Sequence, residues 1–123
     1  MASDVITPAM IERRLRELSK EVDGAHMDLV NIETSYNAAK SKYEIAMAKS
    51  RMKYATTSSP TGKNYTVQER EDLAMIENES LYTDLNIVDA QVKAARANTQ
   101  RLRIQVEIAR SVGTSVRTSM DLT

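Results

Sequence analysis

Residues 48–54 read AKSRMKY and carry three basic side chains at alternate positions, closed by an aromatic ring. These residues are Lys49, Arg51, Lys53 and Tyr54, and Lys63 follows within the next ten positions. Cations that contact phosphates, beside aromatic faces on which bases stack, are what sequence-tolerant binding of single-stranded nucleic acid requires. Binding of a single strand is therefore the first chemistry to consider for this stretch.

Catalysis and metal binding have few candidate residues. The single histidine, His26, stands near Asp23 and Asp28, and these three residues form either an acid–base or metal site or an ordinary polar helix face. The chain has no cysteine and no glycine-rich phosphate-binding motif. We therefore expect a non-enzymatic protein with no catalytic residue, no metal site and no cofactor.

The basic stretch ends a long helix that the sequence predicts over residues 8–54. Thr7 can cap its N-terminus, and Pro8 is tolerated at the first helical position. Apolar residues then recur at alternating spacings of four and three, which is the heptad pattern of a coiled coil. They are Ile11, Leu15, Leu18, Val22, Ala25, Leu29, Ile32, Tyr36, Ala39, Tyr43 and Ala46.

A loop is predicted over residues 55–66, because Ser, Thr, Pro and Gly cluster there. A second helix is predicted over residues 67–112. Thr66 and Glu69 match a capping box at its start, and Gly113 can end it in the left-handed conformation. Its heptad positions are Leu81, Leu85, Val88, Val92, Ala95, Thr99, Leu102, Val106 and Ala109.

Folding the chain at the loop pairs segments of opposite charge. The net charges are −3 for residues 1–39, +5 for 40–63, −6 for 64–90 and +4 for 91–123. An antiparallel pairing sets the first segment beside the last and the two middle segments beside each other. We expect one all-α domain over residues 1–123, an antiparallel two-helix coiled-coil hairpin with a short C-terminal helical segment at 113–123.

Two helices leave part of their apolar surface uncovered, so we expect a homo-oligomer. The second helix carries a further apolar stripe beside its heptad seam, formed by Ile87, Ile104 and Ile108. The sequence leaves open whether each hairpin closes on itself or exchanges a helix with another copy.

The C-terminal segment has two interpretations. Its apolar residues stand four apart, with a basic residue among them, in the set Val112, Val116, Arg117 and Met120. These residues are candidates for an oligomerisation surface. The alternative is a fraying tail.

The heptad pattern predicts apolar residues at positions 50 and 53, where the chain has Ser50 and Lys53. One explanation is that the core ends early and leaves the cations to a ligand. The other is that the hairpin places Lys53 near Glu71, in an ion pair that needs no ligand. The choice depends on whether Glu69, Glu71 and Asp72 leave the basic side chains free.

The stretch AKSRMKY followed by a polar loop resembles the UvsY-type recombination mediators of tailed phages. The likeness extends over about residues 36–120 and includes a basic-Gly break at 110–113 and the SVRTSM end. It implies a non-enzymatic protein that binds single-stranded DNA and forms ring-like oligomers. Such proteins help load a RecA-like recombinase onto DNA covered by a single-strand-binding protein. By position, Lys49 and Arg51 would contact phosphates, Tyr54 would mark the end of the motif, and the segment after Gly113 would assist oligomerisation.

Two functions therefore remain open. The first is a recombination mediator whose partners are single-stranded DNA, a RecA-like recombinase and a single-strand-binding protein. The second is a helical-hairpin scaffold or adaptor, such as a virion or protein-interaction component, that binds no nucleic acid. No charge-free run approaches the roughly 18 residues that span a bilayer, and the N-terminus has an acid at Asp4 and no basic start. We expect no signal peptide and no membrane association, and a phage-encoded protein in the cytoplasm of a bacterial host.

Overall fold

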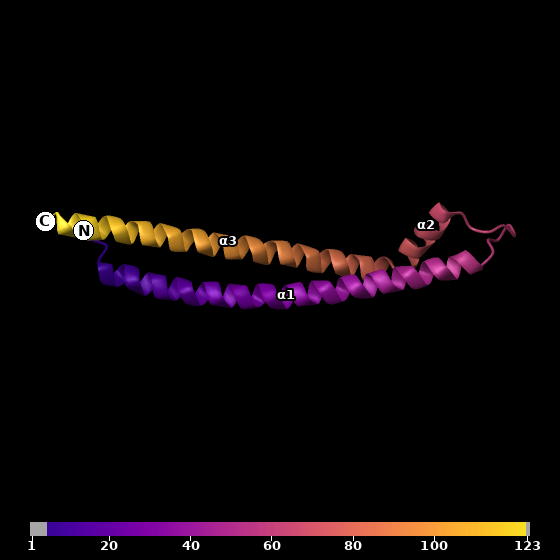
Figure 1. The fold of residues 1–123 in the computed structure, drawn as a ribbon, viewed down its shortest axis with the longest axis horizontal. Coiled ribbons are helices and arrows are strands. Elements are labelled where there is room, and N and C mark those ends of the chain that lie inside the picture. The colour runs from indigo at the N-terminus through magenta and orange to yellow at the C-terminus, as the bar shows by residue number, and fades with distance from the viewer. Residues whose placement is uncertain (1–4, 123) are drawn as a thin grey trace. The chain divides into compact units, whose positions relative to one another are not determined.

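The computed structural model describes residues 5–122, and almost all of them lie in three α-helices. These are α1 (Pro8–Thr56), α2 (Val67–Glu77) and α3 (Glu79–Asp121), shown in Figure 1. Within the described range there is no strand, only an isolated bridge between Ser58 and Asn64. The all-α class is confirmed. Residues 1–4, with the acid at Asp4, and residue 123 lie outside the described range.

The chain divides into two compact units, and both long helices contribute to each. Unit 1 is formed by Met1–Val30 with Lys93–Thr123, and unit 2 by Asn31–Val92. The first part of α1 and the last part of α3 belong to unit 1. The rest of both helices, all of α2 and the loop belong to unit 2.

Both predicted helix starts are confirmed by their caps. Thr7 accepts a hydrogen bond from the backbone N–H of Met10 at its hydroxyl oxygen, 3.2 Å away, and Pro8 takes the first helical position of α1. At α2, the N–H of Glu69 donates to the hydroxyl of Thr66, while the N–H of Thr66 donates to the carboxylate of Glu69. This reciprocal capping box fixes where the chain leaves the loop.

Unit 1 has an apolar core in which the two helices run antiparallel. Near one end Ile11 approaches Gly113, and further along α1 Arg14 reaches Gln105, so numbers rise on α1 as they fall on α3. The core residues are Leu18, Ala25 and Leu102, with Val22, Val106 and Ala109 packed against them. Burial of these groups is the main source of stability available to unit 1.

The predicted inward-facing positions are confirmed by burial. Every heptad position named above, from Ile11 to Ala46 on α1 and from Leu81 to Ala109 on α3, is buried or half-buried. The second stripe is exposed as expected: Ile87, Ile104 and Ile108 each keep about half of their surface accessible.

Gly113 does not end the last helix, which corrects the prediction of a separate segment at 113–123. α3 continues through it to Asp121, and Gly113 is buried without a positive φ. A Cβ added at this position would lie 3.2 Å from Cγ2 of Ile11. The glycine therefore allows two helices to approach closely, a use of glycine distinct from helix termination.

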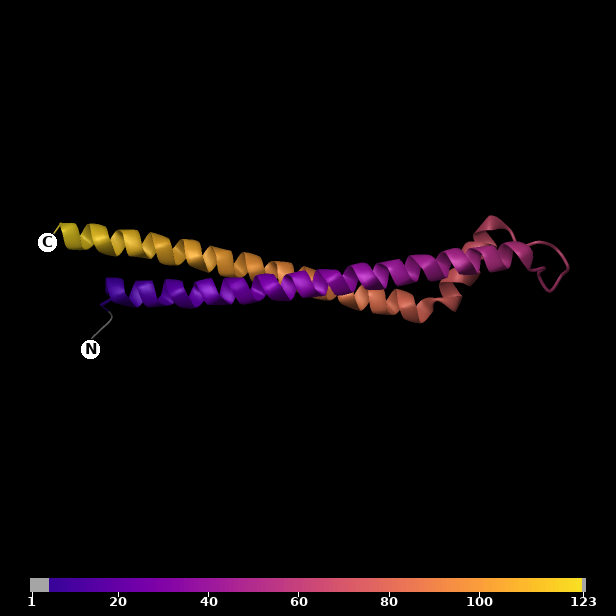
Figure 2. The same ribbon diagram turned by 60° about the horizontal axis from the view of Figure 1, so that its bottom comes forward.

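The second predicted helix is not continuous, because Asn78 separates α2 from α3. Its backbone has φ −107° and ψ 24°, and α2 turns away from the axis of α3 in both views (Figures 1 and 2). The amide Nδ2 of Asn78 donates to the carbonyl of Ala74 at 2.8 Å. Such side-chain hydrogen bonds to the backbone compete with regular helix, which is why Asn is unfavourable in helix interiors.

Candidate nucleic-acid interface in unit 2

The loop between α1 and α2 is built around a glycine turn. The N–H of Gly62 donates to the carbonyl of Ser59 at 2.9 Å, and Gly62 has φ 82°, which favours glycine. The N–H of Ser59 in turn donates to the carbonyl of Lys63 at 2.9 Å. The turn brings the chain back and positions Lys63 and Tyr65 after it.

The inward face at the end of α1 continues through Ser50 and Tyr54. Ser50 is buried and Tyr54 half-buried, whereas Lys53 is exposed. The prediction that Lys53 occupies a seam position is wrong, because the spacing from Ser50 to Tyr54 is four residues. The expected early end of the core is also wrong, since Ser50 is as buried as the apolar residues before it.

A polar network fills the seam where α1 meets the junction of α2 and α3. Ser50 donates to a carboxylate oxygen of Glu77 at 2.7 Å, and Asn78 Nδ2 donates to Ser50 Oγ at 2.9 Å. Met47 and Ala74 are buried beside it. Buried polar groups need partners of this kind, and here Asn78 and Ser50 supply each other.

Two ion pairs flank this seam, one on each side. Nε of Arg51 lies 2.7 Å from Oε1 of Glu71, and a second guanidinium nitrogen donates to Oε2 at 3.2 Å. Nζ of Lys53 lies 2.5 Å from Oε1 of Glu77. The expectation that Lys53 pairs with Glu71 is therefore wrong, because Arg51 takes that carboxylate.

The other two acids near the cations are engaged locally. The carboxylate of Glu69 belongs to the capping box, and Asp72 accepts a hydrogen bond from Gln68 on its own helix. Among the described residues, neither forms an ion pair with a basic side chain of α1. The carboxylates that hold the cations are thus Glu71 and Glu77, and only the first was among the three acids expected there.

The Lys53–Glu77 pair shifts the pKa of both groups. The hydrogen bond to Glu77, with its charge, raises the pKa of Lys53 above its ordinary value. The hydrogen bonds from Lys53 and from Ser50 lower the pKa of Glu77. Both shifts favour the charged forms, so the pair is ionised around neutral pH.

The aromatic residues of the interface pack against one another. The rings of Tyr54 and Tyr65 meet edge to face with centroids 5.8 Å apart, and Nζ of Lys53 lies 5.1 Å from the centroid of Tyr54. A second tyrosine pair in unit 2, Tyr43 and Tyr82, has centroids 5.6 Å apart. The first pair stabilises the contact of α1 with the loop, and the second the contact of α1 with α3.

The predicted site residues are brought together only in part. Lys49 and Lys53 stand four apart on one face of α1, but Arg51 is turned about 200° from Lys49 at 3.6 residues per turn. Lys49 and Lys63 are exposed and form no ion pair within the described residues. The structure thus gives a cation face with Lys49 and Lys53, and a separate position for Arg51.

The side chain of Arg51 lines a groove that the sequence did not indicate. The groove has a volume of about 270 Å³ and combines two guanidinium groups with apolar side chains. It is lined by Arg51, Met52, Ala55, Val67, Arg70 and Glu71. Arg70 reaches it from α2, held by a hydrogen bond from its Nε to the carbonyl of Tyr65 at 3.1 Å. Its position just across the loop in the sequence already placed Arg70 near the basic stretch of α1, and the structure brings it into one groove with Arg51.

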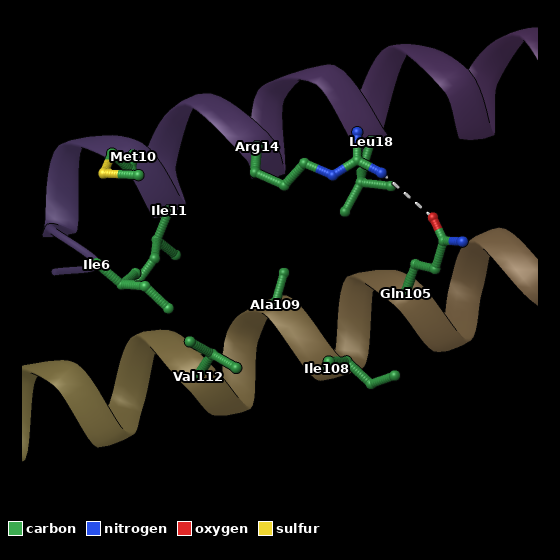
Figure 3. A pocket seen from close by; sticks show the side chains of 9 residues that line it. All are labelled: Ile6, Met10, Ile11, Arg14, Leu18, Gln105, Ile108, Ala109 and Val112. Carbon is green, nitrogen blue, oxygen red and sulfur yellow. Dashed lines mark hydrogen bonds between the residues drawn. The ribbon is translucent and has the colours of Figure 1, made fainter. Parts of the chain in front are cut away.

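Unit 1 contains a larger and mostly apolar groove, shown in Figure 3. Its volume is about 430 Å³, and Arg14 closes one side through a 3.3 Å hydrogen bond to Gln105. The apolar lining consists of Ile6, Met10, Ile11, Leu18, Ile108, Ala109 and Val112. Ile6 precedes the first helix and follows no heptad spacing, so periodicity could not indicate its part in the groove.

The candidate oligomerisation residues all lie on α3 rather than on a separate segment. Val112 and Val116 are half-buried, while Arg117 and Met120 are exposed. Val112 is the only one of the four that lines the groove of unit 1.

His26, Asp23 and Asp28 are all exposed on α1. Within residues 5–122 no group of three or more His, Cys, Asp or Glu side chains is arranged to hold a metal ion. No helix in the same range is long and apolar enough to cross a membrane.

Comparison of the chain with protein families, with curated proteins and with solved structures finds no match. The function therefore has to be argued from the residues and their geometry.

Proposed function

We propose that this protein is a non-enzymatic, single-stranded DNA-binding recombination mediator, folded as an antiparallel coiled-coil hairpin that assembles into a homo-oligomer. The observation that carries DNA binding is the set of exposed cations beside the Tyr54–Tyr65 pair of unit 2. The loading of a RecA-like recombinase onto DNA covered by a single-strand-binding protein rests on the resemblance to UvsY-type mediators.

The paired cations are exposed to solvent, so a phosphate can reach them and replace their carboxylate partners. The side chains of Arg51 and Glu71 are 47% and 39% exposed, and those of Lys53 and Glu77 are 55% and 34% exposed. Exposed pairs gain little from each other, because water screens both charges. A phosphate strand that offers several charges at once can replace them. Lys49, on the same face as Lys53, forms no ion pair with a carboxylate of the described residues.

The tyrosine rings would contact the bases of a bound strand, while the cations contact its phosphates. Tyr54 is half-buried and Tyr65 stands across the loop from it, so each ring is fixed on one side. A base that stacks on an already ordered ring loses less side-chain entropy on binding. Stacking is tolerant of sequence, which is what a mediator acting on any single strand requires.

Self-association would place several copies of this weak binding site along one DNA strand. The groove of unit 1 exposes apolar surface, including about half of Ile6, Met10 and Ile108 (Figure 3). A second copy is the occupant we propose, because the chain has zero net charge and copies do not repel each other. Several linked sites then bind one strand with far higher avidity than a single site.

DNA binding is tested by anisotropy of a labelled, unstructured oligonucleotide across a salt series. The Lys49→Ala/Arg51→Ala variant should bind more weakly and keep its helix content. Its slope of log K against log salt should fall by about 1.4, since each contact to a single strand contributes about 0.7. The matched control is Lys40→Ala/Lys42→Ala, which removes the same charge from exposed positions of α1 in unit 2. Equal affinity for the test variant and wild type would exclude the assignment.

A structural scaffold or adaptor is the second candidate, and the apolar groove of unit 1 favours it. On this view the ion pairs of Arg51 and Lys53 only hold α1 to α2, as pairs that flank a coiled-coil seam do. Such a protein shows no salt-sensitive affinity for DNA at low salt, and light scattering still detects an assembly. Salt-sensitive binding by wild type, lost in the test variant, would rule the scaffold out as the sole function.

A further inference from the structure

We propose that α2 acts as an intramolecular competitor of DNA, in which the carboxylates of Glu71 and Glu77 occupy Arg51 and Lys53 until a phosphate strand displaces them. The inference rests on the proposed function and adds the regulation of its site.

Both carboxylates come from one short element. α2 has 11 residues, and its acids reach the two flanks of α1, Glu71 to Arg51 and Glu77 to Lys53. The Arg51 pair is bidentate, which is also the geometry with which a guanidinium binds a phosphate. A phosphate and Glu71 therefore compete for the same nitrogen atoms.

Little of the apolar surface of α2 is fully buried, although Leu73 is half-buried. Ala74 is its one fully buried residue, while Val67 and Ile76 are each at least 70% exposed. The element is bounded by the loop on one side and by the non-helical backbone of Asn78 on the other. Segments with little buried apolar surface open at low free-energy cost, so we expect α2 to open more often once its two ion pairs are lost.

The groove beside Arg51 shows what displacement exposes. It already holds Arg51 and Arg70 next to Met52 and Val67, with Glu71 as its one acid. When Glu71 leaves Arg51, two guanidinium groups and an apolar surface face the same opening. That combination suits a phosphate with its attached base.

Affinity measurements test the competition. The Glu71→Gln/Glu77→Gln variant should bind labelled oligo-dT about tenfold more tightly than wild type at the same salt. The control is Asp72→Asn/Glu79→Gln, which adds the same charge within unit 2 but touches neither cation. The control should gain about twofold or less, because its carboxylates are screened by water.

The outcomes separate this inference from the function it rests on. If wild type binds and the Gln variant gains no more than the control, α2 is not a competitor while DNA binding stands. If only the Gln variant binds, the carboxylates of Glu71 and Glu77 block DNA binding fully in wild type, and the inference is supported. If neither binds at low salt, both the function and the inference fall.

A measurement on wild type avoids any effect of the substitutions on folding. Amide hydrogen exchange of residues 67–77 should become faster when saturating oligo-dT is added, because the released α2 opens more often. Residues 48–54 should exchange more slowly in the same sample. Slower or unchanged exchange in 67–77 would overturn the inference.

Discussion

Unit 1 and unit 2 are built from the same two long helices, yet their seams differ in chemistry. In unit 1 the seam is apolar around Leu18, Ala25 and Leu102. Thr99, the one buried polar residue among those described in unit 1, donates to the carbonyl of Ala95 on its own helix. In unit 2 the buried polar residues Ser50, on α1, and Asn78, at the junction of α2 and α3, bond to each other.

The difference assigns separate tasks to the two units. An apolar seam buries surface through contacts that are not directional. A buried amide and hydroxyl pair only in one register, and this device costs stability. We therefore attribute the apolar core cluster of Leu18, Ala25 and Leu102 to unit 1, and the register of α1 against α3 to unit 2.

The largest effect is expected for Leu18→Ala, which tests the apolar side of this comparison. Leu18 is 1% exposed at the centre of the core of unit 1. Removing it should lower the free energy of unfolding by about 2–5 kcal/mol, as core Leu truncations do. Urea unfolding followed by circular dichroism measures the loss. Ile104→Ala, at an exposed position of α3 in the same unit, should change stability by about 0.5 kcal/mol or less. Equal losses for the two variants would contradict the assignment of the core.

The next effect is expected for Asn78→Ala, which removes the polar register of unit 2. The acceptors Ser50 Oγ and Ala74 O then lose a donor, which should cost about 1–3 kcal/mol. Replacing both partners in Ser50→Ala/Asn78→Leu should recover much of this loss while weakening the register. Unfolding midpoints give the energies, and double-label distances between α1 and α3 report the register. A double variant as unstable as Asn78→Ala would show that the network contributes stability instead of register.

The sequence predicted what depends on local patterns. The capping box of Thr66 and Glu69 and the inward-facing heptad positions follow from spacing within one helix. Ion pairs between the end of the first helix and the start of the second were expected, because residues 40–63 and 64–90 carry opposite net charge. The structure shows such pairs at Arg51 and Lys53.

The sequence did not predict what depends on contacts between distant residues. Asn78 breaks the helix without Pro or Gly, because its amide bonds to Ala74 and to Ser50 on another helix. From the sequence alone, Gly113 is a candidate for the end of the helix. Only the structure shows that it lies close to Ile11 on the other helix. Lys53 pairs with Glu77 because the seam passes through Tyr54, which shifts the flanking positions by one residue.

A smaller effect is expected from the glycines of unit 1, and it tests how close its helices lie. Gly24→Ala should stabilise by about 0.5–1 kcal/mol, because its Cβ meets no atom within 4 Å and Ala favours helix. Gly113→Ala should gain less or lose stability, since its Cβ would crowd Cγ2 of Ile11 at 3.2 Å. Thermal unfolding of both variants makes the comparison. An equal gain at the two positions would contradict the close approach seen in unit 1.

The smallest effect is expected on changing pH, and it should trace to the Lys53–Glu77 pair of unit 2. The pKa of Glu77 is lowered, so its contribution is complete above the ordinary carboxyl pKa and is lost as pH falls through the lowered value. The pKa of Lys53 is raised, so its contribution is complete below the ordinary amine pKa and is lost as pH rises through the raised value.

Thermal midpoints measured across pH for wild type and Glu77→Gln isolate that contribution. The gap between the two proteins should be widest near neutral pH and should close toward both acid and alkali. Glu79→Gln, an exposed change on α3 next to the same junction, should run parallel to wild type. Because both members of the pair are exposed, the gap should be small beside the loss from Asn78→Ala. A gap that stays constant with pH would mean that the charges of Lys53 and Glu77 contribute nothing to the stability of unit 2, and would contradict a role for this ion pair in holding α2.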